Sequence, residues 1–502
     1  SNMSDIDIIL DEVSLVLTAG NLGYESRSIL KDAFYSASTY ESGYTKVKEL
    51  FPIVPEFHTS QKHTNINVSK AEIDEIPYLG RDYKAIIVLF MHGGCDSYNL
   101  IVPHSECKER DMYKQYESIR GNTTALALQK DELLEIPVPN NTQPCNKFGI
   151  HPKMTVLRDL YITRDAAFIS TIGPLVEPLD KNNFKQKKKP YALFSHNTQR
   201  TTAQNLHADS LSAKGIFGRI GDALRKQDIR NNIYSMAGNT KILEGNAPAK
   251  IIGKNGVEKM KYSDDEEIIT YIQKLTNQQS TSHFMNTFSN IAEKSLNLTE
   301  SISDLFVNSK TTTSFASDSL SKQLRNVARI MNIRQSMKSE RDMFFVQLGG
   351  FDTHSNMKTT VDEKFTIINT ALSSFVTEMK NKSLWNNVLL MTGSDFGRTL
   401  TTNGRGSDHG WAGNMFMIGG NVNGSQILGN YPNSLQRTDD NLIAIGRGRL
   451  IPTTPWEGMW KGVAEWFNVS VSEMDTVFPN LKNFDATHII DLSLIHISEP
   501  TR

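Results

Sequence analysis

The chain has 502 residues, and its 54 Lys and Arg nearly balance its 55 Asp and Glu, which leaves a formal net charge of -1. This balance argues against nucleic acid as the main partner, and no apolar stretch of the sequence approaches the length of a membrane span. The length suits one large α/β domain with insertions, or two or three smaller domains.

The first 60 residues predict a group of helices. The segment "IDIILDEVSLVLTAG" at residues 6–20 repeats its apolar residues with a helical period and ends at Gly20, a usual helix terminator. Two further segments, at residues 25–38 and 44–57, continue the helical pattern. The polar stretch that follows predicts a linker over residues 61–83.

The main domain is predicted over residues 84–488 and opens with a buried strand. Residues 85–91, "AIIVLFM", form a continuous apolar run of strand length, which is typical of a parallel sheet covered by helices on both faces. From about residue 264 to 333 the chain is polar and helical, which predicts a helical insertion. The other elements expected before that insertion are a helix at 154–161 and strands at 166–173, 231–238 and 249–253.

The second half of this domain alternates strands with helices. A strand at 343–348 precedes an amphipathic helix over residues 359–381. Strands are then expected at 387–392 and 415–420, and a last helix at 458–467. Alternation of this kind predicts an α/β fold with a mostly parallel central sheet and helices on both faces.

Two of these strands end in acidic residues and histidine. "FFVQLGGFDTH" ends on Asp352 and His354, while "VLLMTGSDFGRT" contains Asp395 and is followed by "GSDHGW" with His409. The carboxyl ends of parallel strands are where open α/β sheets build their sites. Carboxylate oxygen with imidazole nitrogen suits a divalent cation, Zn²⁺ or Mn²⁺ first, with Ca²⁺ or Mg²⁺ as alternatives. The plainer interpretation is a turn that begins at Asp352 and an ordinary surface histidine.

Three more residues are candidates for the same site. Asp96 follows the first strand and either enters the same crevice or caps a turn. Arg398 either binds the oxygens of a phosphate or sulfate group or forms a salt bridge that closes a loop. Ser195, beside the accessory candidate His196 in "LFSHNTQ", is a candidate nucleophile near a helix start, although capping is the commoner use of such a serine.

Cysteine usage leaves the compartment open. Cys107 and Cys145 sit in polar, loop-like segments, and they either pair in an oxidising compartment or remain two free thiols.

Five of these segments, with others around them, resemble a known family in their residues and in their order. They are "HGGCDSYNLIVP", "LFSHNTQ", "GGFDTH", "SDFGRT" and "SDHGW", and the likeness extends over about Lys84 to Phe484. The family is the domain of unknown function 1501, which is grouped with sulfatase-like members of the alkaline phosphatase superfamily. The resemblance implies a three-layer α/β/α sandwich with one or two metals at the strand ends. A Ser, Thr or modified Cys would be the nucleophile on phosphate or sulfate esters.

The resemblance carries over to particular residues with two departures. It implies metal ligands at Asp96, Asp352, His354, Asp395 and His409, with Ser195 and Arg398 as the catalytic residues. Phe396 stands where relatives have a second histidine, and no cysteine has the neighbours that formylglycine formation needs.

The function expected from these features is metal-dependent hydrolysis of phosphate or sulfate esters, small-molecule or glycan, without formylglycine. One alternative is attack by metal-activated water with no covalent intermediate. The other is a binding or cell-surface protein that retains the fold and has little or no catalysis. Family members are usually exported, so an exported or extracellular location is expected, although the sequence shows no export signal.

Both ends of the chain depart from this family. Residues 1–60 resemble the end of a second uncharacterised family and are predicted to be a remnant of that domain. Residues 489–502 resemble nothing in the family and are expected to be unstructured or artefactual.

Overall fold

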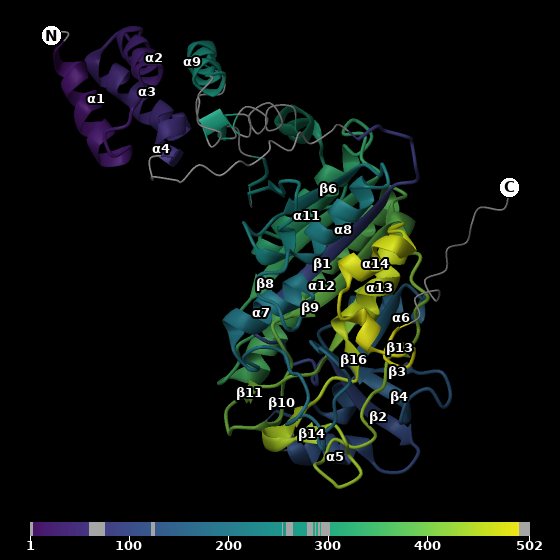
Figure 1. The fold of residues 1–502 in the computed structure, drawn as a ribbon. Coiled ribbons are helices and arrows are strands. Elements are labelled where there is room, and N and C mark those ends of the chain that lie inside the picture. The colour runs from purple at the N-terminus through teal and green to yellow at the C-terminus, as the bar shows by residue number, and fades with distance from the viewer. Residues whose placement is uncertain are drawn as a thin grey trace. The chain divides into compact units, whose positions relative to one another are not determined.

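The structure is a computed structural model that divides the chain into two compact units, Ser1–Asp74 with Val257–Asn308, and Glu75–Gly256 with Ser309–Arg502 (Figure 1). Most of the predicted linker, parts of the predicted insertion and nearly all of the predicted tail lie outside the described residues. The described residues are 4–59, 76–121, 126–253, 255–257, 265–278, 285, 286, 288, 289, 292 and 302–490.

The first unit is helical, as the sequence predicts for its amino-terminal part. Its helices include α1 (Ser4–Leu17), α2 (Tyr24–Tyr35), α3 (Tyr40–Leu50), α4 (Pro55–Thr59) and α9 (Glu266–Thr276).

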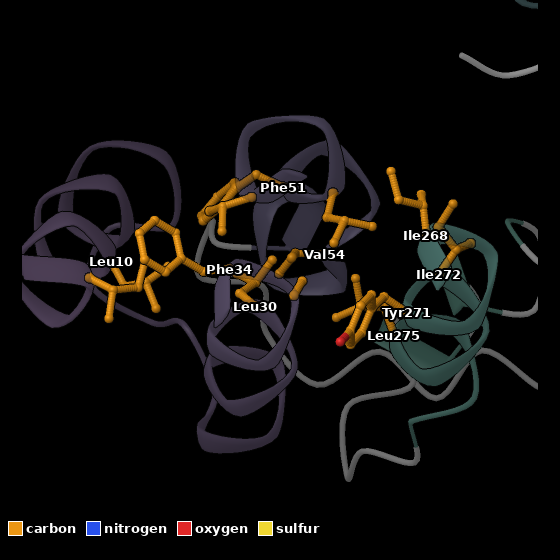
Figure 2. Packing of buried hydrophobic residues seen from close by; sticks show 13 residues of the cluster. Leu10, Leu30, Phe34, Phe51, Val54, Ile268, Tyr271, Ile272 and Leu275 are labelled. Carbon is orange, nitrogen blue, oxygen red and sulfur yellow. The ribbon is translucent and has the colours of Figure 1, made fainter. Parts of the chain in front are cut away.

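One apolar core joins helices of the first unit that are far apart in the sequence. Figure 2 shows Leu30 and Phe34 of α2 in the same cluster as Ile268 and Leu275 of α9. The buried residues of α9 recur at the spacing of one helix face, so this face is the one that packs. The sequence predicts α9 as part of an insertion and does not indicate that it packs with the amino-terminal helices.

The second unit is built on a nine-stranded sheet formed by described residues. Its main order is β13-β5-β12-β9-β1-β8-β6-β7, with β16 also paired to β5. All pairs are parallel except those of β12, which runs antiparallel between β5 and β9. The strands are β1 (Lys84–His92), β5 (Ala166–Gly173), β6 (Asn231–Ser235), β7 (Lys250–Ile251), β8 (Arg341–Gly349), β9 (Val388–Ser394), β12 (Gly413–Ile418), β13 (Ile427–Leu428) and β16 (Thr454–Pro455).

Helices cover both faces of this sheet, and the predicted fold class is confirmed. In one layer α12 (Met357–Asn381) contacts both α6 (Thr155–Ile162) and α11 (Ser319–Asn332). In the other, α8 (Ile216–Arg225) meets α13 (Trp456–Trp466) and α14 (Met474–Val477). None of the helices in the described part of the chain combines the length and the apolar character needed to cross a bilayer.

Smaller elements surround the main sheet, and two of them are joined by a disulfide between Cys107, at the end of β2 (Ile101–Cys107), and Cys145, at the start of β4 (Cys145–Ile150). The others are β3 (Leu134–Pro137), α5 (Met112–Ile119), α7 (His196–Asn205), β10 (Arg398–Thr402), β11 (Ser407–His409), β14 (Ala444–Ile445) and β15 (Arg449–Leu450).

The centre of the sheet positions the site. Strand β1 pairs in parallel with β8 on one side and with β9 on the other. All three strands are almost completely buried because helices cover both of their faces. Their carboxyl ends therefore share one edge, where the chain leaves the sheet towards Asp96, Asp352 and Asp395.

Candidate metal centre

Three separate elements bring one carboxylate and two imidazoles together. Asp352 follows β8, His409 ends β11, and His196 begins α7; their ligand-type atoms all lie within 4.8 Å of one another. A third imidazole, that of His354, lies with Nε2 3.1 Å from Asp352 Oδ1 and 3.0 Å from His409 Nε2. The cluster therefore offers three ring nitrogens around one carboxylate.

Two of these rings are held in one orientation by their other nitrogen. His196 Nδ1 lies 2.8 Å from Asp395 Oδ2, and His409 Nδ1 lies 2.7 Å from the carbonyl oxygen of Phe194. A carboxylate and a carbonyl can only accept, so Nδ1 carries the proton in both rings. In a neutral ring this leaves the Nε2 lone pair free to bind a cation, which is the usual arrangement around histidine ligands of metals.

The third ring follows the same pattern closer to solvent. His354 Nδ1 lies 3.2 Å from Asp408 Oδ1, and Asp408 is itself held by the side chain of Asn403. The hydrogen bond from Asn403 is the main cause that lowers the pKa of Asp408, so this carboxyl stays ionised. His354 is therefore oriented like the two deeper histidines.

The residues present fit a cation such as Zn²⁺. His196 Nε2 is buried and has no hydrogen-bond partner among the described residues, which is costly for a polar atom unless something else binds it. The distances from Asp352 oxygens to Nε2 of His354, His409 and His196 are 3.1, 3.2 and 3.4 Å. Ligands at 2.0–2.1 Å from a tetrahedral Zn²⁺ are about 3.3 Å apart. The donor set is nitrogen-rich with one carboxylate, which Zn²⁺ binds well.

Arg398 supplies the main positive charge beside this cluster. Its side chain is 0% exposed; Nη1 donates to Asp352 Oδ1 at 2.7 Å, and Nη2 donates to the carbonyl oxygen of Ser407. Burial raises the pKa of Asp352, but the hydrogen bond and charge of Arg398 outweigh it and lower that pKa below its ordinary value. Burial lowers the pKa of His409, and the charge of Arg398 acts in the same direction. Ionised Asp352 and neutral His409 are the forms that bind metal.

Phe396 gives the cluster an apolar wall. It is 2% exposed, and its ring centre lies 4.8 Å from that of His196 and 4.7 Å from that of His409. Gly94 makes room for it, because a Cβ at that position would overlap the ring. Where the family resemblance implies another histidine, this chain packs an aromatic ring against two imidazoles.

Two predicted carboxylates have other partners. Asp96 is fully buried and paired with the equally buried Arg120, and no hydrogen bond or ion pair between described residues joins Asp96 to the histidines. Asp395 is also buried; it accepts from the backbone N–H of Gly93 at 3.3 Å and holds His196. Their roles as metal ligands stay predictions, while Asp352, His354 and His409 do come together.

The two residues predicted to be catalytic lie at the cluster in different ways. Ser195 is the residue before α7, half-buried between Phe194 and His196, and its hydroxyl makes no capping bond. Arg398 directs its N–H groups to Asp352 and Ser407, which is the salt-bridge alternative, with Asp352 as the partner.

His196 has a more central place in the site than the sequence indicated. The sequence indicated it only as an accessory candidate, beside Ser195 at a helix start. Its contacts with Asp352 and Asp395 depend on where α7 lies, which the local sequence does not reveal.

A polar cavity of about 530 Å³ lies elsewhere, between residues 108–112, 141–144 and 430–443, and none of the clustered histidines lines it.

Comparison with known proteins gives a family match over most of the chain. The family model described as "Protein of unknown function (DUF1501)" matches residues 83–445. The match begins after the amino-terminal helices, so it does not support the predicted relation of residues 1–60 to a second family. A search of curated proteins finds no match.

Solved structures similar to this chain have very low sequence identity. The C-terminal periplasmic domain of EcEptC from Escherichia coli, in complex with Zn, is 8% identical over 68% of this chain and 73% of that chain, with a TM-score of 0.29. A protein in the alkaline phosphatase superfamily from Vibrio parahaemolyticus is 9% identical over 70% and 64%, with a TM-score of 0.32. Ps i-CgsB in complex with k-i-k-neocarrahexaose is 10% identical over 81% and 77%, with a TM-score of 0.33. Likenesses of this size support no assignment of activity or substrate.

Proposed function

This chain belongs to the DUF1501 family, and His196, His354, His409 and Asp352 form a cluster of possible metal ligands at its sheet edge. From these two findings we propose that the protein is a metal-dependent hydrolase of phosphate or sulfate esters. One observation carries the proposal. Three Nε2 atoms converge on one carboxylate, and each ring is held from behind by an acceptor. Rings oriented in this way are typical of metal ligands.

The metal would be held by His196, His354, His409 and Asp352. A bound divalent cation would supply Lewis-acid stabilisation of the charge that develops on the ester group. The carboxylates of Asp395 and Asp408, and the carbonyl of Phe194, fix the three imidazoles, and Arg398 keeps Asp352 ionised and in place. The ring of Phe396 excludes water from one side of the cluster. These residues hold the proposed ligands in position before the substrate binds, so the site needs no rearrangement during the reaction.

Ser195 is the nucleophile in this proposal. Its hydroxyl is not used as a cap, and its two chain neighbours both contact the cluster. Cysteine is a poor alternative, because Cys107 and Cys145 are joined to each other and Cys95 is fully buried. Burial raises the pKa of the Cys95 thiol well above its ordinary value, so it remains a thiol rather than a reactive thiolate. Loss of activity in Ser195→Ala supports Ser195, and retained activity supports direct attack by water.

The disulfide also bears on location. Disulfides persist in oxidising compartments outside the cytoplasm, and in the structure Cys107 and Cys145 are joined. This supports the expected exported or extracellular site of action on a small-molecule or glycan ester.

Metal analysis combined with hydrolysis tests the function. The purified protein is analysed for Zn and Mn, and then assayed with p-nitrophenyl phosphate and p-nitrophenyl sulfate, with and without added metal. The variants are His409→Ala and, as a matched control, His488→Ala, whose side chain contacts Asp485. We expect metal and hydrolysis in the native protein and the control, and loss of both in His409→Ala.

Three other outcomes contradict parts of this proposal. A native protein that neither binds metal nor hydrolyses either ester with added metal is not the proposed hydrolase. Unchanged metal content in His409→Ala places the metal elsewhere. Bound metal without hydrolysis of either ester would favour a binding protein that retains the fold.

A further inference from the structure

A second arginine, Arg200, lies one helical turn beyond His196 on α7. A spacing of four residues puts both side chains on one face of the helix, with their Cβ atoms about 5–6 Å apart. Arg200 Nη1 donates to His92 Nε2 at 2.6 Å, and Nη2 lies 3.5 Å from Asn197 Oδ1. The guanidinium therefore lies at the end of β1, against the ring of His92, and is carried by the same helix face as His196.

Two connections hold this part of α7 against the end of β1. In the first, the backbone N–H of Gly93 donates to Asp395, which holds His196. In the second, His92 contacts Arg200 directly. The carbonyl of His92 also accepts the N–H of Phe351, the residue before Asp352, at 3.2 Å. Arg200 is thus fixed to the same sheet edge that presents Asp352.

The charge of Arg200 is not neutralised by the protein residues that the structure describes. No carboxylate among them pairs with it, and its contacts are an imidazole nitrogen and an amide oxygen. A guanidinium stays protonated, so His92 Nε2 must accept and adds no compensating charge. Arg398 is the opposite case, because it is fully buried and paired with Asp352. Only Arg200 of these two combines a free charge with exposure to solvent, since its side chain is half-buried.

We propose that Arg200 binds the terminal oxygens of the substrate, and that the substrate therefore carries a tetrahedral oxyanion, a phosphate or sulfate monoester. This inference rests on the proposed function of the same site and deepens it. The planar fork of a guanidinium binds two oxygens of such a group at once, which a lysine cannot do. His92 is a positioning residue, because it directs the guanidinium without touching the substrate.

The test is binding of inorganic phosphate and inorganic sulfate, measured by isothermal titration on the metal-free and the zinc-loaded protein. The variants are Arg200→Met and, as a control, Arg437→Met at an exposed arginine. Charge-assisted hydrogen bonds of this kind lead us to expect about 10- to 100-fold weaker anion binding in Arg200→Met. Zinc content should be unchanged, and Arg437→Met should match the native protein.

The outcomes separate this inference from the function it rests on. Anion binding that needs Arg200 in the metal-free protein supports the inference even if zinc analysis contradicts the metal centre. Native anion affinity in Arg200→Met overturns it even if zinc is bound. Where the ion bound more tightly through Arg200 is phosphate, the substrate is a phosphate ester; where it is sulfate, a sulfate ester.

Three further variants keep the test decisive. If Arg200→Met does not fold, Arg200→Lys keeps one charge without the fork and should still weaken anion binding several-fold. His92→Gln retains an acceptor and should bind the anion as the native protein does, whereas His92→Leu should bind it several-fold more weakly. Equal affinity in Arg200→Lys and the native protein contradicts binding by the fork.

Discussion

Neighbouring strands β1 and β8 are each followed within four residues by an aspartate, but the two carboxylates have opposite surroundings. Asp96, after β1, is fully buried and paired with Arg120, which is also fully buried. Asp352, after β8, has a side chain that is 44% exposed and contacts Arg398 and the three histidines. A carboxylate at a strand end is therefore not sufficient evidence for a metal ligand. Its partners decide which role it can take.

Physical chemistry explains the contrast. A buried carboxylate needs a counter-charge, and the Asp96–Arg120 pair satisfies its charge within the protein. Asp352 has one cationic partner, Arg398, but its other neighbours are imidazoles that can be neutral and present lone pairs. Added positive charge is thus more favourable at the end of β8 than at the end of β1, where the charge of Asp96 is already paired with Arg120, although Asp96 Oδ2 has no hydrogen-bond partner among the described residues.

The largest expected effect is on stability at β1. Asp96→Asn leaves the buried charge of Arg120 without a counter-charge, and such losses cost about 3–5 kcal/mol. Urea denaturation of the metal-free protein should show this loss, and the double variant with Arg120→Met should recover part of it. Zinc content of the folded protein should be unchanged. A variant with native stability and little zinc would show instead that Asp96 is a ligand, as the sequence predicts.

Asp352→Asn, at the end of β8, should instead act mainly on zinc affinity. It removes a direct ligand, so we expect zinc affinity to fall more than about 100-fold, beyond what supporting residues contribute. The metal-free protein should also lose stability, because the buried Arg398 loses its counter-charge, but less than in Asp96→Asn, since solvent reaches the Asp352 side of this pair. Competition with a chromogenic chelator measures the affinity, with the surface substitution Asp485→Asn as control. Equal zinc affinity in Asp352→Asn and the native protein would contradict the proposed centre.

Asp395→Asn distinguishes an orienting carboxylate from a ligand. In the structure Asp395 holds His196 Nδ1, and residues that orient a ligand contribute about 10- to 100-fold to metal affinity. The same competition assay should therefore show a loss smaller than that of Asp352→Asn. A loss as large as that of Asp352→Asn would make Asp395 a ligand in its own right.

The smallest effect is a pH dependence of stability at β8. Because Arg398 lowers the pKa of Asp352 below 3.8, the native state favours the ionised form more than the unfolded chain does. This contribution is complete above the unfolded pKa and is lost as the pH falls through the lower folded one. Exposure limits it to less than about 1 kcal/mol. Urea denaturation of the metal-free protein at pH 5 and pH 3 should show a steeper loss in the native protein than in Asp352→Asn; equal losses would mean that Arg398 does not act on this carboxyl.

Sequence patterns predicted the strands and much of the cluster, because both follow from local features. Continuous apolar runs marked β1 and β9, and the acid and histidine that follow β8 were visible as Asp352 and His354. The partner of Arg398 could not be predicted from the sequence. A salt bridge and the binding of a substrate oxyanion were equal alternatives for it, and its hydrogen bond to Asp352 spans 46 residues of the chain.

The position of His196 could not be predicted from sequence patterns for a related reason. It meets Asp395 across 199 residues of chain, after a loop in which Ala192 and Phe194 have positive φ angles of 36° and 73°. Residues other than glycine seldom adopt such angles, and apolar periodicity carries no information about them. The path of that loop brings the carbonyl of Phe194 to His409 and starts α7 at the cluster.

The core of the first unit also sets the timing of its folding during synthesis. Its amino-terminal part is complete by Val54, but Ile268 to Leu275 belong to the same cluster. About 220 residues must be translated in between, which takes roughly 10 to 45 s at about 5–20 residues per second. Throughout that interval the apolar surface of α2 that meets α9 is open on the nascent chain. Ribosome-associated chaperones that bind exposed apolar segments would have their longest access to this protein there.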